Sequence, residues 1–279
     1  MTTTSIREIT TFSTLAIALT ISMMSCDPAP VDNCPGSEDY SGDNEIEGTD
    51  DADRIDADVG NDLVNGLDGD DRLYGNEGDD ILNGGGGDDN IFGGNGVDTI
   101  AGDDGEDQLF GGGGPDSING GADNDELYGG RAADELKGGG GDDEAHGGRG
   151  DDTLYGGPDN DSLYGGWGDD SLFGGSEDDA LYGGDDDDKL TGGAGSDILS
   201  GGTGIDVFVL GSDCEALDIL TDYESGEKLT APEGVTAGQL GFSQEEWGVS
   251  VSLLTMEDCE LMHILGATST AIQSATEYQ

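Results

Sequence analysis

Apolar residues recur at every ninth position through the middle of this chain, separated by small and acidic residues. In the register that begins at Gly48, residues 48–209 divide into 18 nonapeptides without an insertion or deletion. The eighth position is aliphatic or Phe in every repeat except one, where it is Ala145. The first position is Gly except at Ala57, and the sixth position is Asp throughout. This pattern predicts one short strand and one tight turn per repeat.

The residue types within one repeat indicate where the strand and the turn lie. The first six positions are rich in Gly, which allows positive φ angles and tight turning. The last three, such as Thr153-Leu154-Tyr155, predict a three-residue strand whose apolar side chain faces inward. Two repeats then make one turn of a flattened, right-handed all-β solenoid, and 18 repeats make nine turns spaced about 4.8 Å apart.

Composition alone would suggest a disordered chain. The 279 residues include 54 Gly, and the formal net charge is −56. Acidic chains with few apolar residues are ordinarily disordered, but a disordered segment has no reason to keep a period of nine. The charge excludes nucleic acids and anionic membrane surfaces as electrostatic partners and favours cations.

Stacked turns bring the sixth-position carboxylates close to one another. Asp71, Asp89 and Asp107 would lie about 5 Å apart and repel by roughly 3 kcal/mol per pair at an effective dielectric near 20. A divalent ion between turns removes this repulsion, and carboxylate and carbonyl oxygens favour Ca²⁺. Soft-metal ligands are scarce, since His146 and His263 are the only histidines. The candidate metal ligands are Asp53, Asp62, Asp71, Asp80, Asp89, Asp98, Asp107, Asp116, Asp125, Asp134, Asp143, Asp152, Asp161, Asp170, Asp179, Asp188, Asp197 and Asp206.

Repeats such as Gly84–Phe92 and Gly147–Tyr155 resemble the RTX (repeats-in-toxin) family, whose nonapeptide is Gly-Gly-x-Gly-x-Asp-x-U-x with U a large apolar residue. The resemblance implies a parallel β-roll with calcium ions between loops on the same side, held by Asp carboxylates and main-chain carbonyls. Nine loops per side leave eight gaps, so both sides together would hold at most about 16 ions. No His-Glu-x-x-His or Gly-x-Ser-x-Gly motif is present, and we expect no enzyme activity.

Some repeats depart from the pattern. Ala132 is poorly suited to the left-handed conformation, and Arg131 adds a positive charge to the same loop. We therefore predict that the calcium sites flanked by Asp134 are the weakest, and that Ala145 leaves the core thin. The fourth-position Gly is replaced by Asp51, Asp123, Ala132, Asp159, Glu177 and Asp186.

Ninth-position side chains point outward, and alternate repeats share a sheet. One sheet would therefore carry a continuous ladder of rings. The ladder either stabilises the sheet and shields its backbone, or forms a docking face for a protein, a glycan or a second copy of the roll. Its members are Tyr74, Phe92, Phe110, Tyr128, His146, Tyr164 and Tyr182.

The segments before the repeats indicate export. Residues 1–26 combine Arg7 with an apolar run over residues 12–24 that is too short to span a membrane. The run ends at Cys26 in a sequence that resembles a bacterial lipoprotein cleavage box, which implies lipidation of Cys26; an ordinary cleaved signal peptide is the alternative. Residues 27–47 form an acidic, Pro-rich tether that includes a decayed repeat, with Ile46 in the apolar position and Asn44 in the Asp position.

Residues 210–279 form a capping segment in which the period stops. Residues 218–229 resemble the segment that closes the roll in RTX proteins, and residues 239–242, 247–254 and 261–265 predict short strands. Phe242, Trp247 and Leu253 would supply a compact core. Cys214 and Cys259 are the natural disulfide pair outside the cytosol, which leaves Cys34 unassigned.

These patterns together predict a calcium-binding structural protein of the cell surface or extracellular space. Its folding should be coupled to calcium, because the ions would bind the folded chain and not the unfolded one. An adhesion module for a surface glycan or protein, acting through the ring ladder, and an accessory of a secreted enzyme are the alternatives. Ice binding is disfavoured, because the third-position residues form no Thr or Asn ladder.

Overall fold

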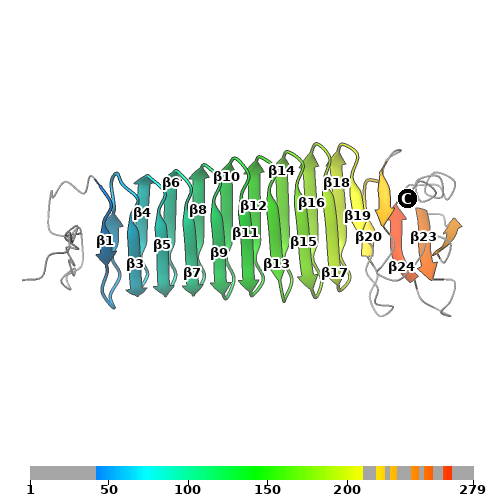
Figure 1. The fold of residues 1–279 in the computed structure, drawn as a ribbon. Helices are drawn as coiled ribbons and strands as arrows, with labels where there is room; N and C mark the ends of the chain where they lie inside the picture. The colour runs from blue at the N-terminus through cyan, green and yellow to red at the C-terminus, as the bar shows by residue number, and fades with distance from the viewer. Residues whose placement is uncertain are drawn as a thin grey trace, which may run out of the picture.

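The protein is a stack of β-strands that advance along one axis (Figure 1). The computed structural model describes residues 42–209, 218–223, 227–230, 240–244, 248–253 and 260–265. These residues form strands, turns and bends without a helix, so this part of the chain has no helix able to cross a membrane. Consecutive strands from β1 to β22 alternate between two sheets, and β23 and β24 join the same sheet as β22, so that sheet A has 11 strands and sheet B has 13.

Within each sheet, neighbouring roll strands come from alternate repeats and run parallel. The strands of sheet A are β1 Glu45–Glu47, β3 Leu63–Asp68, β5 Ile81–Gly86, β7 Thr99–Asp104, β9 Ser117–Ala122, β11 Glu135–Gly140, β13 Thr153–Gly157, β15 Ser171–Ser176, β17 Lys189–Ala194, β19 Val207–Val209 and β21 Lys228–Thr230. Those of sheet B are β2 Arg54–Asp56, β4 Arg72–Glu77, β6 Asn90–Asn95, β8 Gln108–Gly113, β10 Glu126–Arg131, β12 Glu144–Arg149, β14 Ser162–Trp167, β16 Ala180–Asp185, β18 Ile198–Thr203, β20 Asp218–Leu220, β24 Glu260–Leu265, β23 Gly248–Leu253 and β22 Leu240–Gln244. This arrangement confirms the all-β parallel roll.

The prediction of three-residue strands is wrong, because most roll strands have six residues. Strand β5, for example, runs from Ile81 through Gly86 and so includes the first three positions of the next repeat. Those positions still pair with the neighbouring turn, as Gly85 does with Leu67. The first-position Gly, such as Gly84, is buried and has no side chain to accommodate, so the strand continues through this position. The turn is therefore confined to positions four to six.

The core is a single column of eighth-position side chains between the two sheets. From Ile55 to Phe208 every member is at most 1% exposed, and Ala145 is also fully buried in the column. Because each repeat contributes one apolar side chain, burial beyond the column falls on acidic residues. The members of the column from the 18 repeats are Ile55, Val64, Leu73, Leu82, Ile91, Ile100, Leu109, Ile118, Leu127, Leu136, Ala145, Leu154, Leu163, Leu172, Leu181, Leu190, Leu199 and Phe208, and Ile46, Ala57, Leu220 and Leu229 also belong to the buried core.

Strands outside the 18 repeats extend the roll at both ends. Ile46 of β1 is buried, and β1 pairs with β3. Beyond the repeats, β20 and β21 continue sheets B and A, and β24, β23 and β22 are added beside β20. The last three strands lie within two residues of their predicted positions. Trp247, the predicted disulfide partners Cys214 and Cys259, and Cys26 and Cys34 lie outside the described residues.

The predicted ladder of rings is confirmed on sheet B. Adjacent ring centroids from Tyr74 to Tyr182 are 4.6–5.0 Å apart, and adjacent ring planes differ by 1–8°. The rings are therefore stacked face to face, and each interior ring has both faces covered by its neighbours. Arg54 lies 4.9 Å from the Tyr74 ring at one end.

Candidate metal centre

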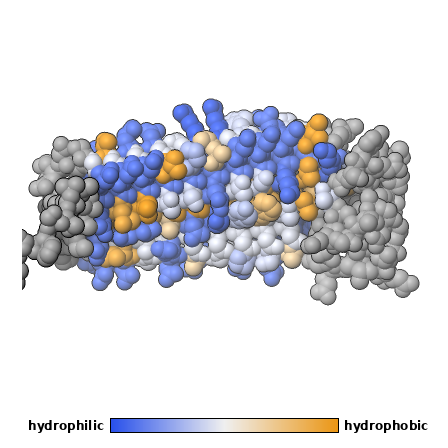
Figure 2. Space-filling view, viewed as in Figure 1, coloured by the Kyte–Doolittle hydropathy of each residue, from blue (hydrophilic) through white to orange (hydrophobic). Residues whose placement is uncertain are grey.

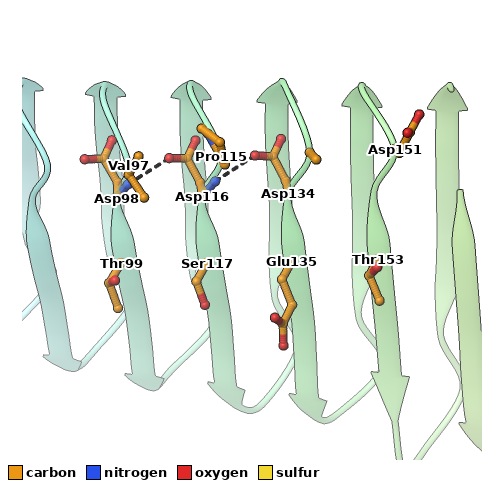
Figure 3. Close-up of a pocket in the computed structure, with 11 residues that line it drawn as sticks. Val97, Asp98, Thr99, Pro115, Asp116, Ser117, Asp134, Glu135, Asp151 and Thr153 are labelled. Atoms are coloured by element: carbon orange, nitrogen blue, oxygen red, sulfur yellow. Dashed lines mark hydrogen bonds between the residues drawn. The ribbon is translucent and has the colours of Figure 1, made fainter. Parts of the chain in front are cut away.

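The sixth-position Asp residues form two columns, one along each edge of the roll. Column I lies on edge I, where strands of sheet A turn into strands of sheet B, and column II lies on edge II, where sheet B turns into sheet A. Figure 3 shows Asp98, Asp116 and Asp134 of column II side by side on successive turns. Column I comprises Asp53, Asp71, Asp89, Asp107, Asp125, Asp143, Asp161, Asp179 and Asp197, and column II comprises Asp62, Asp80, Asp98, Asp116, Asp134, Asp152, Asp170, Asp188 and Asp206.

One oxygen of each carboxylate joins two turns of the roll. The Asp71 main-chain N–H donates to Asp89 Oδ1 at 2.7 Å, and the Asp89 N–H donates to Asp107 Oδ1 at 2.8 Å. The same bond recurs along column II, for example from Asp98 to Asp116 Oδ1 at 2.9 Å (Figure 3). These bonds fix the orientation of each carboxylate, a role that the sequence pattern did not predict.

The second oxygen of most of these carboxylates is buried without a hydrogen-bond donor among the described residues. A buried carboxylate oxygen that lacks a partner is costly, so Oδ2 is the atom that calls for a cation. The residues whose Oδ2 atoms are in this state are Asp62, Asp71, Asp80, Asp89, Asp98, Asp107, Asp116, Asp125, Asp134, Asp143, Asp152, Asp161, Asp170, Asp179 and Asp188.

The Gly at the first position keeps open the space into which Oδ2 points. A Cβ at Gly66 would clash both with Oδ2 of Asp71 and with the carbonyl oxygen of Gly84 on the next turn. A carboxylate oxygen and a carbonyl oxygen therefore face the same small space. Acidic side chains alone are not enough, since no three His, Cys, Asp or Glu residues of the described part are grouped to hold a metal. Carboxylate and main-chain oxygens together are the donor type that Ca²⁺ prefers.

Burial is the main electrostatic cost of the columns. Loss of hydration raises the pKa of Asp89 to about 7 and the pKa of Asp125 to about 8. Repulsion from neighbouring Asp residues contributes less to the rise in these pKa values than desolvation does, and the hydrogen bond to Oδ1 opposes the rise. The sequence pattern indicates repulsion between carboxylates as the main cost, whereas in the structure desolvation raises the pKa values more than repulsion does. A bound cation offsets both desolvation and repulsion.

Asp53 differs from the other members of column I. Its Oδ2 accepts hydrogen bonds from the main-chain N–H of Thr49 at 2.7 Å and from the Thr49 hydroxyl at 2.9 Å. Thr49 stands at the second position of its repeat, where Gly is usual. The Asp53 carboxylate is thus already satisfied locally, which makes it the least suited of the predicted ligands.

Two acidic residues after the repeats continue the columns and were not predicted as site residues. Asp218 Oδ1 accepts from the Asp197 N–H at 3.3 Å, and Glu227 precedes β21, whose Leu229 pairs with Phe208. Both residues are at most 3% exposed. The spacing to the previous turn is 21 residues instead of 18, so the period hides them. The retained signal is an acid two positions before a buried Leu.

The fifth position forms a second hydrogen-bond ladder that sequence reasoning also missed. Asp88 Oδ1 accepts from the Glu106 N–H at 3.1 Å, and Asp142 Oδ1 accepts from the Asn160 N–H at 2.9 Å. The fifth-position side chains reach the next turn of the roll, whereas the sixth-position side chains reach the previous turn. A loop that takes part in both ladders is therefore tied to the turn before it and to the turn after it.

Edge II contains a groove where this second ladder is interrupted. The groove has a volume of about 360 Å³ and runs past Val97, Pro115 and Ala133 at the fifth position of three successive turns. Figure 3 shows Val97 and Pro115 on neighbouring turns. The neighbouring Ala132 has a φ of 80°, the strained conformation expected from its position. That the sites beside Asp134 bind calcium most weakly stays a prediction.

Comparison with known proteins agrees with this geometry. The model of the RTX calcium-binding nonapeptide repeat family (4 copies) matches residues 39–73, 65–100, 101–136, 137–172 and 173–208. These matches cover more than half of the chain, which therefore belongs to the RTX calcium-binding repeat family. The roll is a calcium-binding structural module.

Other comparisons add little. No curated protein matches the sequence. Among solved structures, the chain is similar to the extracellular lipase LipA from Serratia marcescens at 15% identity and a TM-score of 0.19. The match covers 86% of this chain and 40% of the lipase chain, so this chain spans less than half of the lipase. A TM-score this low supports no conclusion about function.

Proposed function

We propose that this protein is a non-enzymatic, calcium-binding structural protein of the cell surface or extracellular space, and that it folds only when calcium binds. The observation that carries the proposal is the repeated buried Oδ2 that has no hydrogen-bond donor among the described residues, on both edges of the roll. The proposed ligands are the sixth-position Asp residues together with main-chain carbonyls, for a total of at most about 16 ions. The apolar column is one side chain thick and leaves these carboxylates buried beside it.

Coupling to calcium would make the location of folding depend on calcium concentration. An ion that binds the folded chain alone stabilises it by about 2.7 kcal/mol per site when its concentration is 100 times the Kd. Summed over many sites, this stabilisation would leave the chain unfolded at the low calcium concentration of the cytosol and folded at the higher concentration outside it. Export through residues 1–26, a lipid on Cys26 and a Cys214–Cys259 disulfide are further parts of the proposal.

We infer that the ring ladder stabilises sheet B and is not a binding platform for sugar rings. Its ring faces are covered by the stacking itself, and stacked pairs on neighbouring strands stabilise a sheet. Replacing Phe92, Phe110 and Tyr128 together by Ser should lower the thermal midpoint without changing self-association or glycan binding. A loss of binding at unchanged stability would restore the docking hypothesis.

Circular dichroism of the chain from residue 27 onward tests the main proposal. At pH 8 we expect strong β signal in millimolar calcium and an unfolded spectrum after chelation, with recovery when calcium is added back. Magnesium at the same concentration is the control, because its stricter octahedral demand fits these loops poorly. Unchanged β content in chelator would refute the coupling of folding to calcium.

A further inference from the structure

Three exposed residues on adjacent strands of sheet B form a surface that is unlike the rest of the roll. Arg131 ends β10, Arg149 ends β12 and Trp167 ends β14, and the pairing places the three residues in one row. We call this row the basic patch. Trp167 is 55% exposed and the Arg149 guanidinium lies 5.1 Å from the centroid of its ring. The face of the roll seen in Figure 2 is mostly hydrophilic, with separate apolar areas.

The two arginines have no anionic partner within the described residues. The chain has 8 Lys and Arg against 64 Asp and Glu, so partners are abundant. Arg54 and Lys137 each form an ion pair, with Asp56 and Glu135, whereas Arg131 and Arg149 form none in this part of the chain.

Two carboxylates in the same row accept hydrogen bonds from other side chains. Glu77 accepts a hydrogen bond from Asn95 at 3.0 Å, and Asp185 accepts one from the Thr203 hydroxyl at 3.0 Å. At the adjoining fifth positions Ala133 carries no charge, and Asp151 is acidic but accepts a hydrogen bond from the Asp169 N–H at 3.2 Å. Two guanidinium groups on neighbouring strands repel by about 1 kcal/mol even in water. The row is therefore arranged to receive a negative charge from outside the chain.

The chemistry of the patch specifies the partner further. Guanidinium groups bind carboxylates through paired hydrogen bonds, and an exposed indole offers an apolar face beside them. This face contrasts with the ring ladder, where the stacked rings cover one another. We propose that the basic patch binds an acidic saccharide, with a sugar ring against Trp167 and its carboxylates on Arg149 and Arg131.

The overall negative charge of the protein limits but does not prevent this contact. Screening confines charge interactions to about 8 Å at physiological ionic strength, so the local patch decides binding at contact. Binding should therefore weaken with added salt. The saccharide site rests on the proposed function only because it requires a folded roll, and it does not depend on how many calcium ions the folded roll holds.

The test measures binding of trigalacturonate to the calcium-loaded full chain by isothermal titration calorimetry. We expect R131Q/R149Q and W167A each to weaken binding at least tenfold. R54Q/R72Q is the matched control, because it removes the same two positive charges from exposed positions of the neighbouring strands β2 and β4, and it should change the Kd less than twofold. Circular dichroism of each variant shows whether the roll remains folded.

Several results would overturn the proposal. Binding that persists in R131Q/R149Q would place the saccharide on the calcium-bearing edges instead. A glutamate oligopeptide that binds as tightly, or a W167A variant that binds normally, would indicate an acidic protein partner. Self-association that R131Q/R149Q abolishes would identify a second copy of the chain as the occupant, and no binding at all would also refute the proposal.

Discussion

The two edges of the roll are built from the same nonapeptide and differ mainly at its fifth position. On edge I, Asp or Asn side chains accept hydrogen bonds from the next turn along nearly the whole roll, with one interruption after Glu106. On edge II the same ladder stops at Val97 and resumes at Asp151. Both edges keep an unbroken column of sixth-position Asp residues.

The interruption on edge II removes fifth-position acceptors, but it does not leave a main-chain N–H without an acceptor at every turn. Val97 offers no acceptor to the next turn, and Pro115, which stands there, has no N–H that needs one. Ala133 follows, and the N–H of Asp151 then faces a turn without an acceptor at the fifth position. In our proposal the sixth position provides the ion site, and the fifth position decides how firmly each loop is held around it. We expect calcium to bind edge I more tightly than the middle of edge II.

The largest predicted effect is one that the two edges share. In the calcium-free roll the pKa of Asp125 is raised to about 8, that of Asp188 to about 8 and that of Asp134 to about 7, from 3.8. A raised pKa means that the folded state binds more protons, so acid stabilises it; this contribution is full below about pH 4 and is lost as pH rises through 6–8. In chelator we expect more β content at pH 5 than at pH 8 by circular dichroism. Equal content at both pH values would contradict burial as the main cost.

Neutralising one sixth-position carboxylate on each edge tests whether the two edges differ in how tightly they bind calcium. Asp107→Asn on edge I keeps an oxygen that can accept from the Asp89 N–H but removes the charge, so it should vacate the flanking sites at about 3 kcal/mol each. Asp116→Asn on edge II should cost less, because its sites are weaker. Calorimetric stoichiometry and chemical denaturation in calcium measure both. Asp88→Asn at the exposed fifth position is the control, and equal losses on the two edges would remove the distinction.

Substitutions at the fourth position should change backbone strain in opposite directions: one relieves strain on edge II, and the other adds strain on edge I. Ala132→Gly on edge II should stabilise the roll by about 1 kcal/mol, because Gly adopts the positive φ of 80° without strain. Gly141→Ala on edge I should destabilise it by more, since the new Cβ would meet the Asp123 carbonyl. Urea unfolding at fixed calcium measures both changes. A neutral Ala132→Gly would show that this loop is not strained.

The smallest predicted effect concerns the fifth position itself. Ala133→Asn adds an acceptor for the Asp151 N–H without adding charge and should stabilise edge II by about 1 kcal/mol. Asn160→Ala on edge I removes the acceptor of the Asp178 N–H, a 3.2 Å bond, and should cost a similar amount. Hydrogen exchange of the Asp151 and Asp178 amides reports each change locally. Unaltered protection in both variants would dismiss the second ladder as a stabilising feature.

The strict features of the repeat could be predicted from the sequence. The constant Asp and the apolar eighth position indicate the two columns and the core, because each has one residue type and one period. Strand length was mispredicted, since Gly at the first three positions suggests a turn, whereas the main chain of residues such as Gly85 still pairs with its neighbour. Pairing between turns, not local preference, decides where a strand ends.

The remaining site residues were hidden for different reasons. Fifth-position Asp88 and Asn160 look like ordinary exposed polar residues until the turns are stacked and their oxygens meet main-chain N–H groups. Asp218 and Glu227 fall outside the period of 18, although they occupy the same place in the roll. Their role depends on how a longer connection folds, which the nonapeptide pattern does not encode.

Anomalous scattering from crystals of the calcium-loaded protein would show whether calcium lies beside the Oδ2 atoms of the two columns. We predict anomalous peaks beside the Oδ2 atoms of both columns, strong along edge I and weaker between Asp98 and Asp152 on edge II. Peaks of equal height there would contradict the difference between the edges. Calcium bound elsewhere, with the Oδ2 atoms of a folded roll still lacking a cation, would contradict the account of the fold itself.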